Sequence, residues 1–194
     1  MTQAVVAAPA RLAPARVILN AAGFQLGWFA CVLGAARGEA ALGTGVAALL
    51  LALHVATAPR RRQEALLIGG VVLLGFAWDS ALAAAGIVRY DTGVLLPGTA
   101  PYWIGALWAL FAATLNSSMR WIRHRWRVAL AFGALGGPLS FWAGVRLGAA
   151  AFPDTTLALA ALSLGWAVWM PLLVHLAARL DRSPDVPARA AQHG

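Results

Sequence analysis

The chain has 194 residues, of which 61% are hydrophobic and only 11% charged, and its net charge is +8. Water-soluble domains carry about 25% charged residues, whereas the mean hydropathy here is +0.73. The composition therefore excludes an ordinary soluble domain and indicates a membrane protein.

The apolar residues fall in six long runs. A helix needs roughly 20 mostly apolar residues to cross the hydrocarbon core of a bilayer, and in lipid its backbone groups must be hydrogen-bonded internally. The sequence shows no alternation typical of barrel strands. It predicts an all-α polytopic bundle with transmembrane helices at residues 17–36, 40–58, 65–87, 101–119, 128–151 and 155–178.

The connections between these runs are short, so the six helices form one transmembrane domain at residues 17–178. Residues 1–16 precede it, and residues 179–194 mix proline, alanine and charge, which is typical of a disordered tail. Every basic residue except histidine is an arginine, and twelve of the 15 fall on one side of this arrangement. The positive-inside rule then predicts a bacterial inner-membrane protein with both termini in the cytoplasm.

The positive charge lies in short loops at helix ends. Arginines at such positions orient a membrane protein and contact anionic headgroups, whereas a nucleic-acid-binding protein carries its charge on a basic domain or stripe. We therefore expect membrane lipids as partners, consider other membrane subunits as further partners, and expect no nucleic acid.

The predicted fifth helix carries a face of small residues at intervals of three or four positions. Such a face lets helix backbones approach closely in lipid. Its residues are Gly133, Gly137, Ser140, Gly144 and Gly148.

Asp79 is the most informative polar residue, because an acidic side chain inside the membrane is costly and is usually paired or functional. It shares a helix face with Gly75 and Gly86, so it should point into the bundle. An ion pair with Arg146 that fixes helix packing is one interpretation, although Arg146 can instead extend to the headgroups. The third interpretation makes Asp79 a catalytic acid or base, or the anchor of a ligand.

Further candidate binding residues lie in the first helix and in the loop after the third. Gln25 and Trp28 either make contacts between helices, which is the usual role of such side chains, or belong to the same site as Asp79. The loop can cover a cavity above Asp79, with an interfacial turn as the alternative. Its candidates are Arg89, Tyr90, Asp91 and Trp103.

His54 and His175 lie at similar depths on the predicted second and sixth helices, a pattern that bis-histidine haem ligation uses. Histidine also suits membrane interfaces, and no carboxylate is evident near either ring to orient it. We therefore predict no metal or cofactor and retain the two histidines as the pair to test. The phosphate-loop, His-Glu-x-x-His and Gly-x-Ser-x-Gly motifs are missing from the sequence, so no catalytic class is assigned.

Polar, aromatic and glycine residues spread over both halves of the chain resemble a known family. The first half carries Asn20, Phe24-Gln25, Trp28-Phe29, Trp78-Asp79 and Gly86. The second half carries Pro101, Trp103, Leu107-Trp108, Phe111, Gly136-Gly137-Pro138, Ser140-Phe141 and Ala143-Gly144. Over residues 18 to about 152 or beyond, this set resembles the bacterial membrane family catalogued as domain of unknown function 2878. Genes of that family often lie near those of fatty-acid methyltransferase-like and flavin oxidase-like enzymes, so the resemblance implies a lipid-related membrane role.

Three functions remain open at this point. The first is a lipid-handling membrane protein, enzyme or accessory, with a cavity around Asp79, Arg146, Gln25 and Trp103. The second is a non-catalytic subunit of a larger membrane complex. The third is a small proton- or cation-coupled transporter in which Asp79 is the relay. The family resemblance favours the first.

Overall fold

The computed structural model describes residues 13–181, and this part of the chain is a bundle of six α-helices and one short 3-10 helix. The predicted all-α fold is confirmed, while the predictions for residues 1–12 and 182–194 lie outside the described residues. The elements in chain order are α1 (Pro14–Ala36), α2 (Ala40–Thr57), α3 (Arg61–Ala84), α4 (Tyr102–Leu115), η1 (Arg120–Ile122), α5 (Trp126–Arg146) and α6 (Thr155–Leu180).

Five of these helices, namely α1, α2, α3, α5 and α6, are long and apolar enough to cross a membrane. Large apolar side chains on their outer faces are exposed, as expected where helices contact lipid. Helix α4 has 14 residues, which span about 21 Å and so fall short of the roughly 30 Å hydrocarbon core. Ten of its residues are buried. The described chain is therefore a multi-pass membrane bundle around a short, enclosed helix.

Three predicted helices end earlier than expected, because the chain turns there. Gly86 and Gly148 have φ angles of +70° and +88°, a left-handed conformation that glycine adopts without strain and that commonly ends helices. Helix α4 ends before Ser118, whose backbone N–H and hydroxyl both donate to Asn20 Oδ1. These hydrogen bonds tie the end of α4 to α1, 98 positions earlier in the chain.

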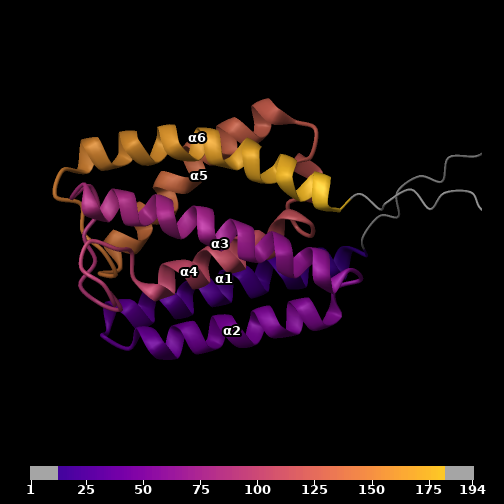
Figure 1. The fold of residues 1–194 in the computed structure, drawn as a ribbon, viewed down its shortest axis with the longest axis horizontal. Coiled ribbons are helices and arrows are strands. Elements are labelled where there is room, and N and C mark those ends of the chain that lie inside the picture. Colours follow the sequence, from indigo (N-terminus) through magenta and orange to yellow (C-terminus); the bar gives the residue numbers. More distant parts are fainter. Residues whose placement is uncertain (1–12, 182–194) are drawn as a thin grey trace, which may run out of the picture.

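The helices alternate in direction, so the start of α1 and the end of α6 lie at the same end of the bundle (right in Figure 1). We call this the basic end, because the arginine-rich starts of α3 and α5 and helix η1 lie there. The opposite end, which we call the loop end, holds residues 85–101 and 147–154. Helix α2 lies at one edge and α6 at the other (Figure 1). Helix α5 packs mainly on α6, whereas α1 packs on α2 and α4, and α3 packs on α4.

Glycines allow the closest helix contacts, as the sequence predicted for α5. A Cβ atom added to Gly133 would lie 2.2 Å from the carbonyl oxygen of Trp166 in α6. At Gly43 of α2, a Cβ would lie 2.2 Å from the carbonyl oxygen of Ala30 in α1. Only glycine fits at these two crossings, which bring the backbones of α5 and α6, and of α1 and α2, into contact.

Candidate functional site

Two stacked tryptophans occupy the centre of the bundle. The rings of Trp108 in α4 and Trp166 in α6 are parallel within 2°, with their centroids 4.8 Å apart. A Cβ atom at Gly75 of α3 would lie 2.0 Å from the Trp108 ring, and one at Gly137 of α5 would lie 2.2 Å from the Trp166 ring. Each glycine backbone therefore packs directly on an indole. The four residues form a tryptophan–glycine column that joins α3, α4, α6 and α5.

Asp79 lies one turn beyond Gly75 in α3 and is completely buried. The indole Nε1 of Trp108 donates to Asp79 Oδ2 at 2.6 Å, so the column holds the carboxyl group in place. The other oxygen, Oδ1, has no hydrogen-bond partner among the described residues. Asp79 thus points into the bundle, as predicted, and keeps one oxygen unused.

Arg146 does not form the ion pair considered above. Its guanidinium carbon lies 5.8 Å from the ring centroid of Trp142, and its side chain is exposed. Within residues 13–181 no ion pair joins Arg146 to Asp79. The second interpretation, in which a long cationic side chain at a helix end extends to the headgroups, stays a prediction.

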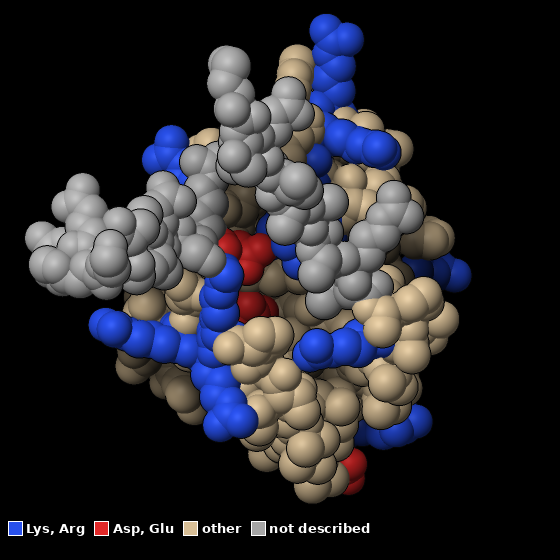
Figure 2. Space-filling model, turned by 90° about the vertical axis from the view of Figure 1, so that its right-hand side faces the viewer, with Lys and Arg blue, Asp and Glu red and all other residues tan. Residues whose placement is uncertain are grey.

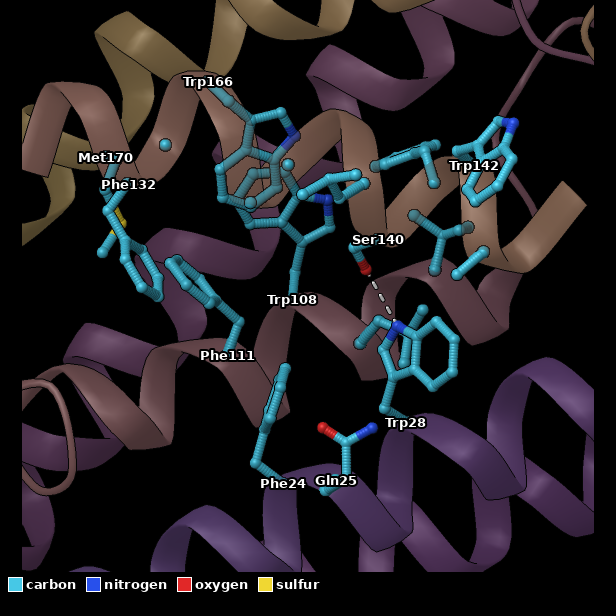
Figure 3. Close-up of a pocket in the computed structure, with 18 of the residues that line it drawn as sticks. Phe24, Gln25, Trp28, Trp108, Phe111, Phe132, Ser140, Trp142, Trp166 and Met170 are labelled. Carbon is cyan, nitrogen blue, oxygen red and sulfur yellow. Dashed lines mark hydrogen bonds between the residues drawn. The ribbon is translucent and has the colours of Figure 1, made fainter.

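A cavity of about 720 Å³ lies beside the tryptophan–glycine column, between α1, α4, α5 and α6. Figure 3 shows aromatic rings from these helices facing one another across it. Its tryptophans are Trp28, Trp108, Trp142 and Trp166, and its phenylalanines are Phe24, Phe29, Phe111, Phe132 and Phe141. Its polar side chains are Gln25, Asp79, Ser140 and Arg146. The cavity therefore suits an apolar ligand with a small polar group.

The cavity opens sideways between α1 and α5. These two helices make little backbone contact, and Trp28 Nε1 spans the gap by donating to Ser140 Oγ at 3.0 Å (Figure 3). The exposed large side chains on its rim are Phe29, Phe132, Leu139, Trp142 and Leu147. Both α1 and α5 are long and apolar enough to cross a membrane, so the opening lies on the side of the bundle and not at one of its ends.

The family of the chain follows from comparison with known protein families. The sequence model of a family described as "Protein of unknown function (DUF2878)" matches residues 17–172. The chain belongs to the DUF2878 family. The resemblance seen in the sequence is confirmed, and the match includes every residue that lines the cavity, from Phe24 to Met170. Neither the curated proteins nor the solved structures include a match to the chain.

In this DUF2878 protein the four predicted loop residues do not line the cavity. Trp103 is buried, its Nε1 donates to the Thr92 carbonyl oxygen at 2.9 Å, and Tyr90 packs edge to face on it. The backbone of Arg89 pairs with the connection between α5 and α6, and Asp91 is exposed. These residues build a cap at the loop end. The predicted residues that do line the cavity are Gln25, Trp28, Asp79 and Arg146.

A polar network at the basic end was missed by the sequence analysis. His54 Nε2 and Glu64 Oε1 are 2.9 Å apart, and Asn116 Nδ2 donates to Glu64 Oε2 at 2.8 Å. Arg123 donates to Asn116 and, at 2.7 Å, to Asp181. Figure 2 views this end and shows arginines around a recess that holds acidic side chains. The network links α2, α3, α6 and the connection after α4.

The structure does not bring the two candidate haem ligands together. His54 faces Glu64, so the expectation that no carboxylate lies near it was wrong, because the partner is on the next helix, one residue before its predicted start. His175 is exposed on α6, and α2 and α6 lie at opposite edges of the bundle (Figure 1). Residues 13–181 contain no group of three or more His, Cys, Asp or Glu side chains placed to hold a metal ion.

Several wall residues of the cavity were also missed. Trp166, Phe132 and Met170 stand within apolar runs, where an aromatic or sulfur side chain looks like any core or lipid-facing residue. A usable signal existed for Trp108 and Ser140, because both belong to the motifs that carry the family resemblance.

Proposed function

We propose that this protein binds a membrane lipid in the cavity and takes part in lipid handling or lipid modification. The observation that carries the proposal is the large aromatic cavity with exposed apolar side chains at its rim on α1 and α5. A lipid can enter such a cavity sideways without crossing water, and its hydrocarbon chain then packs against the rings. The volume is within the range of about 300–1,000 Å³ that ligand sites typically have.

We further propose that the protein resides in the bacterial inner membrane with both chain termini in the cytoplasm. Nine of the twelve arginines in residues 13–181 lie at the basic end, where Arg60, Arg61 and Arg62 precede or start α3. Such an excess of arginine favours the cytoplasmic side. Asp79 and the cap at the loop end then lie in the outer half of the membrane.

Gly136 offers a way to fill the cavity without disturbing helix packing. A Cβ atom there would meet only Phe132, at an ordinary contact distance of 3.8 Å, so a leucine side chain can project into the cavity. Gly69 of α3 is the matched control, because it is exposed, lies outside the cavity and has open space around its missing Cβ. The variants Gly136→Leu and Gly69→Leu therefore differ in whether the new side chain occupies the cavity.

The test is mass spectrometry of the lipids and polypeptides that co-purify with the protein in mild detergent. We expect wild type and Gly69→Leu to carry a lipid species enriched above the bulk membrane, and Gly136→Leu to lack it. Asp79→Asn should also lose the selected lipid while its melting temperature shows that it still folds. Equal lipid content in Gly136→Leu and Gly69→Leu would refute the proposal. A stoichiometric polypeptide with no selected lipid would indicate a subunit of a larger complex instead.

A further inference from the structure

The wall of the cavity contains polar atoms that no protein contact uses. Asp79 Oδ1 and Trp166 Nε1 are buried, lack a hydrogen-bond partner among the described residues, and belong to side chains that line the cavity. Trp78 Nε1 and the Tyr90 hydroxyl are likewise buried and without a partner there. Buried polar groups in folded proteins are nearly always hydrogen-bonded. One unused acceptor and one unused donor on side chains that line the cavity therefore point to the polar group of a ligand.

These four groups belong to one neighbourhood. Trp78 directly precedes Asp79, and Trp166 stacks on Trp108, whose Nε1 donates to Asp79. Burial, and then the charge of Asp79, raise the pKa of Tyr90 well above its ordinary value, so the two side chains share one electrostatic environment. Trp78, Tyr90 and Trp166 also pack against one buried cluster, which consists of Leu82, Val88 and Leu162.

The set of unused atoms selects among lipid headgroups by elementary hydrogen-bond chemistry. In its ionised form the carboxyl group of Asp79 only accepts hydrogen bonds, whereas an indole N–H only donates and a hydroxyl group does both. An anionic headgroup would be repelled by the ionised carboxylate, and an ammonium group would leave the indole N–H of Trp166 unpaired. A carbonyl oxygen cannot donate to Asp79 Oδ1.

Building on the proposed lipid-binding function, we propose that the bound lipid is neutral and carries a free hydroxyl group, which donates to Asp79 Oδ1 and accepts from Trp166 Nε1. Both atoms are covered in the described conformation, so binding includes a small movement of side chains at this wall. The Trp108–Asp79 hydrogen bond keeps the second carboxyl oxygen occupied, which leaves Oδ1 as the atom that recognises the ligand.

Arg146 is the competing anchor, because a guanidinium binds phosphate or carboxylate groups. It lies at the exposed rim, over Trp142, and is free to reach headgroups of the surrounding bilayer. A solvated arginine needs no bound ligand to satisfy it, whereas the buried atoms at Asp79 and Trp166 do. Because the unused atoms are buried, recognition of a hydroxyl group by Asp79 and Trp166 is favoured over recognition of an anionic group by Arg146.

Three probe lipids with the same two oleoyl chains separate these headgroup classes. They are 1,2-dioleoylglycerol with its free hydroxyl, the 3-acetyl ester of that alcohol, and dioleoyl phosphatidate with its negative charge. Each is titrated into the full-length protein in mild detergent, and binding is measured by native mass spectrometry. We expect dioleoylglycerol to bind at least about tenfold more tightly than the ester, as the loss of a hydrogen bond to a charged group predicts. In Asp79→Asn, with folding checked by melting temperature, this preference should shrink.

The outcomes separate this inference from the proposed function. Equal affinity for the alcohol and its ester would overturn the hydroxyl group as the recognised feature while leaving lipid binding intact. Tighter binding of phosphatidate than of the alcohol would also overturn it, in favour of recognition by Arg146. No binding of any probe, together with no enriched lipid in the purified protein, would remove the proposed function itself. The wild-type comparison decides the matter even if Asp79→Asn fails to fold.

Discussion

The tryptophan–glycine column allows a stability prediction that depends on one atom. The substitution Gly75→Ala places a Cβ atom 2.0 Å from the Trp108 ring, whereas carbon atoms pack at about 3.5–4.0 Å. The Trp108 ring cannot simply move away, because Trp166 is stacked on it and Gly137 packs on Trp166. Overpacking of this kind costs about 1–3 kcal/mol, and the better helix propensity of alanine recovers about 0.5–1 kcal/mol. We expect a net loss of about 2 kcal/mol, near the upper end, because the column is rigid.

Thermal unfolding in mild detergent measures this loss. In a chain of this size about 2 kcal/mol corresponds to a melting temperature lower by about 4–8 °C. The control is Gly69→Ala in the same helix, where the new methyl group meets open space and the melting temperature should stay level or rise. In a Trp108→Phe background, the smaller ring leaves room, so the penalty of Gly75→Ala should shrink. Equal melting temperatures for Gly75→Ala and Gly69→Ala would show that the close contact between Gly75 and the Trp108 ring does not exist in the protein.

Three further predictions concern contacts outside the column. Glu64→Ala removes the acceptor of two hydrogen bonds in the network at the basic end and should destabilise the fold by about 1–3 kcal/mol, whereas Glu39→Ala at an exposed position should leave the melting temperature unchanged. Trp28→Phe and Ser140→Ala each remove the hydrogen bond across the cavity opening, which should lower the free energy of unfolding by up to about 1.5 kcal/mol. Both variants should also exchange a bound fluorescent lipid faster than wild type. An unchanged exchange rate would show that lipid does not pass between Trp28 and Ser140. Arg146→Gln should leave the preference for dioleoylglycerol over its ester intact in the native mass spectrometry assay, and a lost preference would contradict the placement of the headgroup.

The physics of the bilayer made most of the fold predictable. Long apolar runs without charge can be little other than helices in lipid, so the number and order of the helices followed from run length. The ends of the helices did not follow from it. Residues 149–151 are as apolar as the helix before them, yet Gly148 turns the chain out of the helix at φ +88°. The left-handed conformation of this one glycine ends the helix, and the hydropathy of the sequence gives no sign of it.

The candidate site was predictable only in part, because charge reveals ion pairs better than it reveals neutral partners. Asp79 could be placed inside the bundle from the glycines on its helix face, but the nearest candidate partner by charge was Arg146. The observed partner is the neutral indole of Trp108, 29 positions along the chain. Likewise, His54 and Glu64 are ten positions apart on two helices, and only the packing of α2 beside α3 brings them into contact.

The cavity itself could not be predicted, because in a membrane the residues that line an apolar cavity are chemically the same as those that face lipid. What separates them is where the helices approach and where they part. Gly133 and Gly137 draw α5 onto α6, whereas Ser140 of the same face accepts the hydrogen bond from Trp28 of α1. The bulky Phe132 and Trp142 of the same helix face the cavity instead, and large rings cannot pack closely enough to seal α5 against α1. The two glycines that the sequence revealed on α5 therefore pack this helix on α6, while its large rings keep it apart from α1, and the hydrogen bond from Trp28 to Ser140 crosses the gap.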